Sequence, residues 1–174
     1  MRKWSSLLMG LLLIQACNNS PVQENPLNEI HALEDKMRAL DYLDTSLAAD
    51  MAVAYSSFIE EEGNDSLKPY YHYKLAELYR HWPGMEVEAI QTFHEVEETY
   101  TYHEVAPRAI LSLGLFYEEM AQKDRAVAAY QEFIDRFPSH ELAGQARSLQ
   151  EMLLNEQVTD IQRVQEWKKN SVNK

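Results

Sequence analysis

The sequence predicts an all-α protein in which pairs of antiparallel helices stack on one another along the chain. Of the 174 residues, 45% are hydrophobic and only 5 are glycine, a composition typical of a helical globular domain. Apolar residues recur three and four positions apart in several segments after residue 26, which is the spacing of helices with one buried face. A set of apolar, small and aromatic residues returns about every 38 residues, and such a period indicates a structural repeat.

The clearest copy of the repeat lies between residues 105 and 138. Its marked positions are Leu113, Gly114, Tyr117, Ala126, Tyr130 and Pro138. This pattern resembles the tetratricopeptide (TPR) repeat, with Ile110 at the place of that repeat's tryptophan. The resemblance implies a right-handed superhelical stack of helix pairs, with about three repeats and capping helices. Gly114 and Ala126 would let the paired helices approach closely, and Pro138 would end the second helix because proline cannot continue its hydrogen bonds.

Earlier segments carry the same positions. In the first helix, Leu75, Ala76 and Tyr79 precede their counterparts by 38 residues. In the second helix, Ala89 and Phe93 precede theirs by 37 residues, so residues 82–84 absorb the difference. Repeats longer than 34 residues resemble those of bacterial envelope lipoproteins, namely the small TPR subunit of the outer-membrane β-barrel assembly machine and the TPR domain of the Tol-Pal coordinator. The resemblance covers about residues 27–154.

The start of the chain predicts an export signal followed by a lipid anchor. Residues 1–16 have a basic start and a short apolar run, too short to cross a hydrocarbon core of about 30 Å and typical of a secretory signal peptide. Residues 14–17 (Ile-Gln-Ala-Cys) resemble the lipobox of bacterial lipoproteins, which implies acyl chains such as palmitate on Cys17, the only cysteine. Two or more such chains anchor a protein stably. An ordinary signal peptide beside an incidental cysteine is the alternative.

The residues after Cys17 predict where the anchor lies. Asn18, in place of an aspartate, implies the outer membrane by the same resemblance, and the absence of an acidic run after Cys17 favours the side that faces the periplasm. Residues 17–26 are therefore expected to form a lipidated cysteine and a flexible tether with two prolines. The tether would lead into a TPR-like helical domain at residues 27–157.

The remaining elements follow in order. The first repeat is expected to have one helix from Leu27 and a second from about Ser46 to Glu62, followed by repeats at 67–100 and 101–138. Residues 140–154 are predicted to form a capping helix, because a terminal repeat exposes one face to water. Residues 158–174 are expected to hold a short final helix and a frayed tail, and capping-box spacing at Thr159 would mark the start of that helix. The final helix would fold back on the cap, which is favoured, or dock a partner.

Several classes of function are disfavoured. The net charge of −12 argues against nucleic acid, which needs clustered Lys and Arg. No two of the six histidines lie three or four residues apart, so no metal site is expected. Nucleophile, phosphate-binding and dinucleotide motifs are missing. We therefore expect no enzyme, no cofactor and no small-molecule substrate.

The resemblance also implies a binding surface, because the first helices of TPR proteins line a concave groove that holds a peptide. The positions that would face this groove are Tyr70, Tyr73, Glu77, Arg80, His81, Arg108, Leu111 and Leu115, with Glu118 and Glu119 beside them. Packing of Tyr70 or Tyr71 into the core is the alternative for those two side chains.

The predicted function is therefore that of a lipid-anchored scaffold for a protein or peptide partner in the bacterial cell envelope. Outer-membrane protein assembly and envelope maintenance are its expected settings. The alternative is a structural, self-associating helical module without a peptide groove. Such a module would join copies through the exposed edge of the first repeat or through the helix that carries Trp167.

Overall fold

The computed structural model describes residues 25–61, 63 and 65–172, and the regular secondary structure of this part of the chain is all α-helical. The predicted all-α stack is confirmed. Its elements are α1 (Pro26–Arg38), α2 (Thr45–Glu60), α3 (Lys68–Arg80), α4 (Glu86–Thr99), α5 (Val105–Glu119), α6 (Lys123–Arg136) and α7 (Ala143–Val172).

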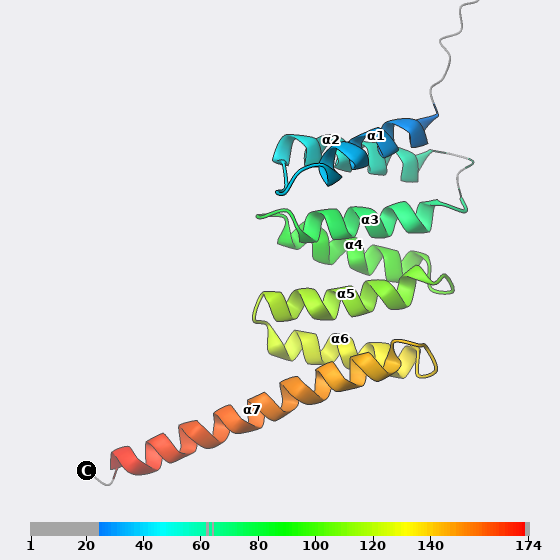
Figure 1. The fold of residues 1–174 in the computed structure, drawn as a ribbon. Helices are drawn as coiled ribbons and strands as arrows, with labels where there is room; N and C mark the ends of the chain where they lie inside the picture. The colour runs from blue at the N-terminus through cyan, green and yellow to red at the C-terminus, as the bar shows by residue number, and fades with distance from the viewer. Residues whose placement is uncertain (1–24, 62, 64, 173–174) are drawn as a thin grey trace, which may run out of the picture.

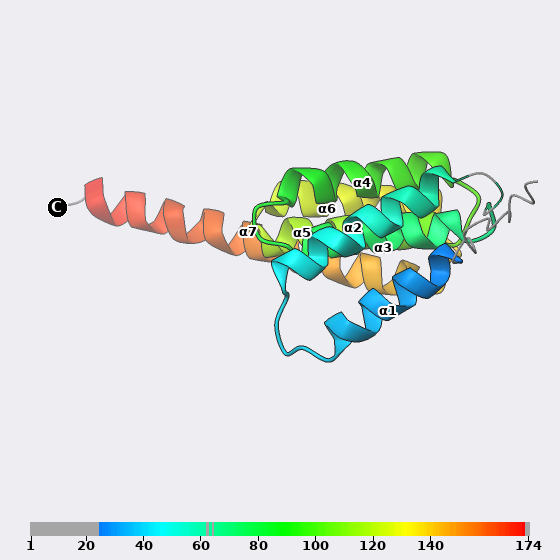
Figure 2. The ribbon, with the colours of Figure 1, turned by 90° about the horizontal axis from the view of Figure 1, so that it is seen from above.

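The helices are arranged as three antiparallel pairs and a final single helix. Figure 1 shows α1 with α2, α3 with α4 and α5 with α6 in successive levels, and α7 below them. Each helix packs against the next one along the chain, and α3 also contacts α5 in the following pair. Figure 2, seen along the stack, shows α4 and α6 together on one side of α3 and α5. Helices α3 and α5, the first helices of the second and third pairs, are therefore neighbours, and α4 and α6 lie on the same side of them.

The repeat positions lie where the helices of a pair meet. All of them are buried except Tyr79, which is half-buried, and Pro138, which is exposed after the end of α6. Gly114 shows most directly why the position is small. A Cβ atom built on it would lie 2.5 Å from Cε1 of Tyr130, closer than side-chain atoms approach one another. Glycine therefore allows α5 to lie against the tyrosine of α6.

The buried side chains form two cores that meet at α3. The first core includes Ile30 of α1, Phe58 of α2 and Leu75 of α3. The second core runs from Ala76 of α3 through α4, α5 and α6 to Leu153 of α7. Because Leu75 and Ala76 are adjacent, α3 joins the two cores. Helix α5 is the most buried element, with eleven buried residues.

The helix ends follow from local sequence. The Asn25 side chain accepts a hydrogen bond from the Leu27 amide at 3.1 Å, and Pro26 is the first residue of α1. Proline is favoured there because its missing N–H would have no partner inside the helix. Pro26 was predicted to end the tether, so the helical domain starts one residue earlier than expected. The Asp44 side chain caps α2 by accepting from the Leu47 amide at 2.9 Å.

The C-terminal region differs from the prediction, because α7 is one continuous helix of 30 residues. The predicted boundary between a capping helix and a short final helix is wrong. The Thr159 hydroxyl donates to the Asn155 carbonyl oxygen at 3.0 Å, so Thr159 lies inside the helix instead of capping a new one. The predicted folding back is also wrong, since the C-terminal half of α7 projects beyond the stack (Figures 1 and 2).

The N-terminal half of α7 closes the stack as a cap. Arg147, Glu151 and Leu154 stand 37 residues after Ile110, Gly114 and Tyr117. In the third repeat these positions are buried, whereas all three are exposed in α7. A terminal helix needs this change because no further helix covers its outer face.

The predicted signal peptide at 1–16, Cys17 and the tether up to residue 24 lie outside the described residues. Within the residues that are described, no helix is both long enough and apolar enough to cross a membrane.

Candidate partner-binding face

The predicted groove residues come from the neighbouring first helices α3 and α5 and from His81, which follows the last residue of α3. We call the surface they share the first-helix face. Its members are Tyr70, Tyr73, Lys74, Glu77, Arg80, His81, Arg108, Leu115, Glu118 and Glu119. The contact between α3 and α5 brings side chains that are almost forty residues apart in the sequence into one surface.

One cluster on this face joins the first and second repeats. Lys74 of α3 donates to Glu34 of α1 at 2.6 Å, and the Tyr55 hydroxyl of α2 donates to the same carboxylate oxygen at 2.8 Å. The Lys74 ammonium also lies 5.0 Å from the centre of the Tyr70 ring, within the range of a cation–π contact. Although burial opposes its charge, Glu34 raises the pKa of Lys74 above its ordinary value. Lys74 therefore stays charged and holds the Tyr70 ring through this contact.

A second cluster joins the second and third repeats. The Tyr73 hydroxyl lies 3.0 Å from the Glu77 carboxylate and 2.9 Å from the Ser112 hydroxyl of α5. Arg80 binds Glu119 of α5 through two nitrogens, at 2.5 and 3.2 Å, and its Nη1 lies 3.5 Å from Glu77. A guanidinium bound in this way holds both helices in one register, because the paired hydrogen bonds fix direction as well as distance.

The pKa values in the second cluster keep these hydrogen bonds in place near neutral pH. Burial raises the pKa of the Tyr73 phenol to about 12, so the phenol stays protonated and can donate. The hydrogen bond from Arg80 lowers the pKa of Glu119 below its ordinary value, so this carboxylate stays charged. Both contacts stabilise the fold, and neither side chain has the reactivity of a general acid or base near neutral pH.

The structure separates the predicted groove residues into accessible and occupied side chains. Tyr70 is 42% exposed, and His81 and Arg108 are also exposed. Tyr73, Glu77 and Arg80 are half-buried and held in the second cluster. Leu115 is half-buried and packs against the second core. The accessible contacts for a ligand therefore lie at the edges of the face.

The prediction for Leu111 is wrong. Its side chain is only 6% exposed and belongs to the second core, because α5 packs against α3, α4 and α6 and is buried along most of its length. The neighbouring Ser112 is also buried, and its hydroxyl meets Tyr73 of the preceding repeat. Sequence reasoning also missed Lys74 and Glu34, whose pairing across 40 residues leaves no local signal. One signal could have found Lys74. It stands three residues before Glu77 on the same helix, and residues at this spacing lie on one face.

A third polar cluster lies on the second helices, away from the predicted groove. Glu97 of α4 is only 5% exposed; it accepts a hydrogen bond from Arg136 of α6, and its carboxylate lies 3.0 Å from His94 Nδ1. Burial would raise the pKa of Glu97, but the bonds from His94 and Arg136 outweigh it and lower this pKa below its ordinary value. The bond to Glu97 in turn raises the pKa of His94. The cluster joins the second and third repeats.

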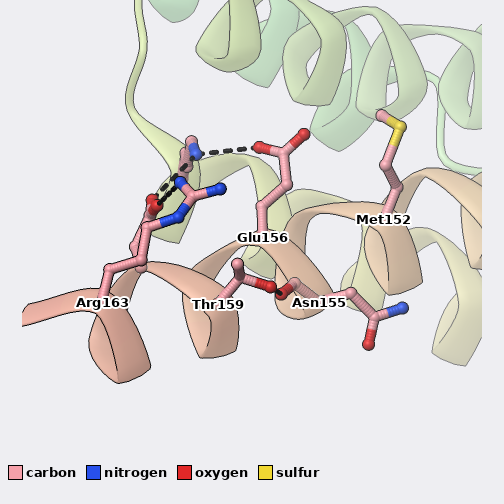
Figure 3. A pocket seen from close by; sticks show the side chains of 7 residues that line it. Met152, Asn155, Glu156, Thr159 and Arg163 are labelled. Atoms are coloured by element: carbon pink, nitrogen blue, oxygen red, sulfur yellow. Dashed lines mark hydrogen bonds and ion pairs between the residues drawn. The ribbon is translucent and has the colours of Figure 1, made fainter. Parts of the chain in front are cut away.

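An open hollow of about 590 Å³ lies where α7 passes the start of α6 (Figure 3). Lys123 of α6 enters it and binds Glu156 at 2.8 Å and Asp160 at 3.9 Å. Met152, Asn155, Thr159 and Arg163 complete its lining. The hydrogen bond from Lys123 to Glu156 raises the pKa of this lysine, so Lys123 is a cation that holds α7 to α6 and not a proton acceptor.

Metal ligation finds no support in the described part of the chain, where no group of three or more His, Cys, Asp or Glu side chains could hold an ion. The arrangement offers instead a rigid surface with a few accessible aromatic and charged side chains. Such side chains, above all Tyr and Arg, supply much of the energy at protein interfaces.

Stacked antiparallel helix pairs of this kind define a helical-repeat protein, in which each repeat contacts only its neighbours. Within this class, a family model described as tetratricopeptide repeat matches residues 108–140. The match covers most of α5, all of α6 and the turn that follows. The chain therefore contains a tetratricopeptide repeat. A comparison with the curated proteins finds no significant match.

Proposed function

We propose that this protein is a scaffold that binds a protein or peptide partner on the first-helix face. The observation that carries the proposal is the stack itself, since the first helix of the matched tetratricopeptide repeat, α5, and the first helix of the preceding pair, α3, form one surface. Repeats of this kind generally mediate interactions between proteins, and stacked repeats create extended binding surfaces.

The contacts beneath the face support this proposal. Glu34 and Lys74 join α1 to α3, and Arg80 and Glu119 join α3 to α5. These bonds hold the surface in one shape before a ligand arrives, which lowers the entropy lost on binding. Tyr70 is then the principal anchor, because its ring is exposed and supported by Lys74.

We further propose that the scaffold is anchored to the bacterial outer membrane by acyl chains on Cys17 and faces the periplasm. The support is the sequence of residues 1–17, with its basic start, short apolar run and single cysteine. More specifically, we propose that the protein takes part in outer-membrane protein assembly or envelope maintenance.

The lipid anchor is tested by measuring the mass of the protein's N-terminal peptide, isolated from the membrane fraction. An acylated Cys17 is expected, and a Cys17→Ser chain should leave the membrane fraction; an unmodified Cys17 on the mature protein would contradict the anchor.

The binding face is tested by affinity purification of the tagged full-length protein from detergent-solubilised envelopes, with mass spectrometry of the proteins that co-purify. Tyr70→Ala should reduce recovery of the true partner about tenfold, as loss of an interface anchor does. Tyr102→Ala is the matched control, because Tyr102 is fully exposed in the turn before α5 and is not a member of the first-helix face. A partner lost equally in both variants would contradict the proposed face.

The second candidate is a structural module that joins copies of itself without a peptide ligand. The exposed apolar side chains on the projecting part of α7 favour it. If an untagged copy of this chain is the only protein that co-purifies with the tagged chain, the result would support this candidate over the scaffold.

A further inference from the structure

The projecting part of α7 carries an apolar stripe on the same side as the helix's packing face. The stripe consists of Ile161, Val164 and Trp167, which are 57%, 51% and 69% exposed. We call residues 161–172 the α7 tail. It extends roughly 18 Å at 1.5 Å per residue. Lys123 of α6 pairs with Asp160 of α7 at 3.9 Å, just before this stripe.

The stripe continues the face that packs on α6. Each of its residues stands 18 positions after a residue at the base of α7, namely Ala143, Ala146 and Leu149. Because 18 residues make five full turns of an α-helix, both sets lie on the same side of α7. Ala143 and Ala146 are buried in the second core, and Leu149 packs against it. The stripe therefore has the position of a helix-packing face that continues past the start of α6.

The charges of this segment are arranged for an antiparallel copy of itself. Asp160 lies just before the stripe, and Lys168 lies just after its last residue. An antiparallel pairing centred on Val164 places Val164 opposite itself and Ile161 opposite Trp167. The same register places Asp160 of each copy opposite Lys168 of the other, and it brings no like charges together at these positions. A parallel pairing would instead place each charge opposite its own kind.

We propose that the α7 tail docks a second copy of this chain as an antiparallel, two-fold symmetric helix pair centred on Val164. A symmetric contact of this kind closes after two copies and does not propagate. The pair would hold two first-helix faces on one assembly. The inference does not depend on the partner-binding face, because the two surfaces share no residue.

The contact is small, so the dimer is expected to be weak. Three apolar side chains from each copy bury less surface than the roughly 800 Å² per partner of a standard interface. The dimer should therefore form at high micromolar concentration in solution. Attachment of both copies to one membrane would raise their effective concentration and favour the pair.

The test is sedimentation of the full-length chain over a concentration series, in which the dissociation constants of two variants, each with one substitution in α7, are compared. Val164→Glu places a charge at the centre of the pair and should raise the dissociation constant more than tenfold, because both copies bring the charge to the same point. Val158→Glu is the matched control. Val158 is similarly exposed, at 54%, but lies six residues earlier and hence about 120° around the helix. The Val158→Glu substitution should leave the dissociation constant within about twofold of that of the unsubstituted chain.

A charge exchange tests the register. Asp160→Lys alone places two lysines opposite one another, and Lys168→Asp alone places two aspartates together, so each should raise the dissociation constant about tenfold. The double variant restores opposite charges and should return it to within about threefold of the original. Helicity is measured for every variant, since Asp160 also pairs with Arg163 at 3.1 Å within its own helix.

Three results would overturn the proposal. The first is a strict monomer at every concentration, including a monomer whose Trp167 fluorescence shifts on phosphatidylglycerol vesicles, which would assign the stripe to a lipid surface. The second is equal loss of the dimer in the Val158 and Val164 variants. The third is failure of the double charge exchange to recover the dimer while the variants remain helical.

Discussion

Gly114 decides how closely the two helices of the third repeat approach. Its missing side chain leaves room for the Tyr130 ring, whose hydroxyl donates to Glu118 of α5. The ring is fully buried and its hydroxyl is held, so it cannot move aside without breaking a contact. At this scale the fold depends on the absence of one methyl group.

We expect Gly114→Ala to lower the free energy of unfolding by about 1–3 kcal/mol, the usual cost of an extra methyl group in a packed core. Urea unfolding measures it. Gly144→Ala is the control, because a Cβ at Gly144 meets nothing within 4 Å and alanine in a helix adds roughly 0.5–1 kcal/mol. Equal effects of the two substitutions would contradict the close approach of α5 and α6.

A pH effect is expected from His94 and Glu97. The pKa of His94 is raised in the folded protein, so its contribution to stability is complete below its ordinary pKa of about 6.5. This contribution is lost as the pH rises through the higher folded value. Glu97→Gln removes the cause of the shift, so the stability advantage of the original chain over this variant should be larger at pH 6 than at pH 8.

The matched control for this pH effect is Glu86→Gln in the first turn of the same helix. Its carboxylate accepts a hydrogen bond from the Gly84 amide and not from a histidine, so its effect on stability should not vary between pH 6 and pH 8. Unfolding curves of the three proteins at several pH values measure both differences. A constant difference for Glu97→Gln would show that His94 is not coupled to Glu97.

At the scale of the element, α7 has two parts with different roles. Its N-terminal half supplies Ala143, Ala146 and Leu153 to the second core. Its middle is held to the start of α6 by Lys123–Glu156 and by the bond from Gln157 to Asp124 at 2.8 Å. The α7 tail lies beyond these contacts.

A chain that ends at Gln157 should therefore unfold at the same urea concentration as the full chain, when both are measured at low protein concentration. Leu153→Ala in the full chain should instead lower the stability by about 2–5 kcal/mol, as is typical for a buried leucine. The truncated chain should also lose the proposed dimer. Destabilisation by truncation as large as that from Leu153→Ala would contradict the separation of roles within α7.

At the scale of the whole molecule, stability is uneven along the stack. Helix α1 is a terminal element that buries only Ile30 and Leu33, whereas α5 packs against α3, α4 and α6 and buries eleven residues. In a stack of repeats each unit is stabilised mainly by its neighbours, so an end unit opens more easily than an inner one.

Hydrogen exchange followed by mass spectrometry should show this gradient. Peptides from residues 30–38 are expected to exchange at least tenfold faster than peptides from residues 108–117, because local opening of α1 breaks fewer buried contacts. Equal protection in both segments would indicate a single cooperative unit in place of two cores joined at α3.

The sequence predicted the stack well, because small and aromatic residues at fixed spacing report helix contacts inside one pair. The contacts between pairs were harder to predict. Leu111 was assigned to the groove although α5 is buried on that side, and the support of Tyr70 by Lys74 and Glu34 depends on residues 40 positions apart. The continuity of α7 was missed because Thr159 can either cap a helix or, as here, bond back to the preceding turn.

The most direct test of the central claim is site-specific photo-crosslinking in intact cells. A photo-reactive residue placed at position 70 should crosslink the same partner protein that co-purifies with the full-length chain, because Tyr70 is the proposed anchor of the first-helix face. The same residue placed at position 102 should not crosslink it. A partner that crosslinks at position 102 and not at position 70 would contradict the account of how this protein binds.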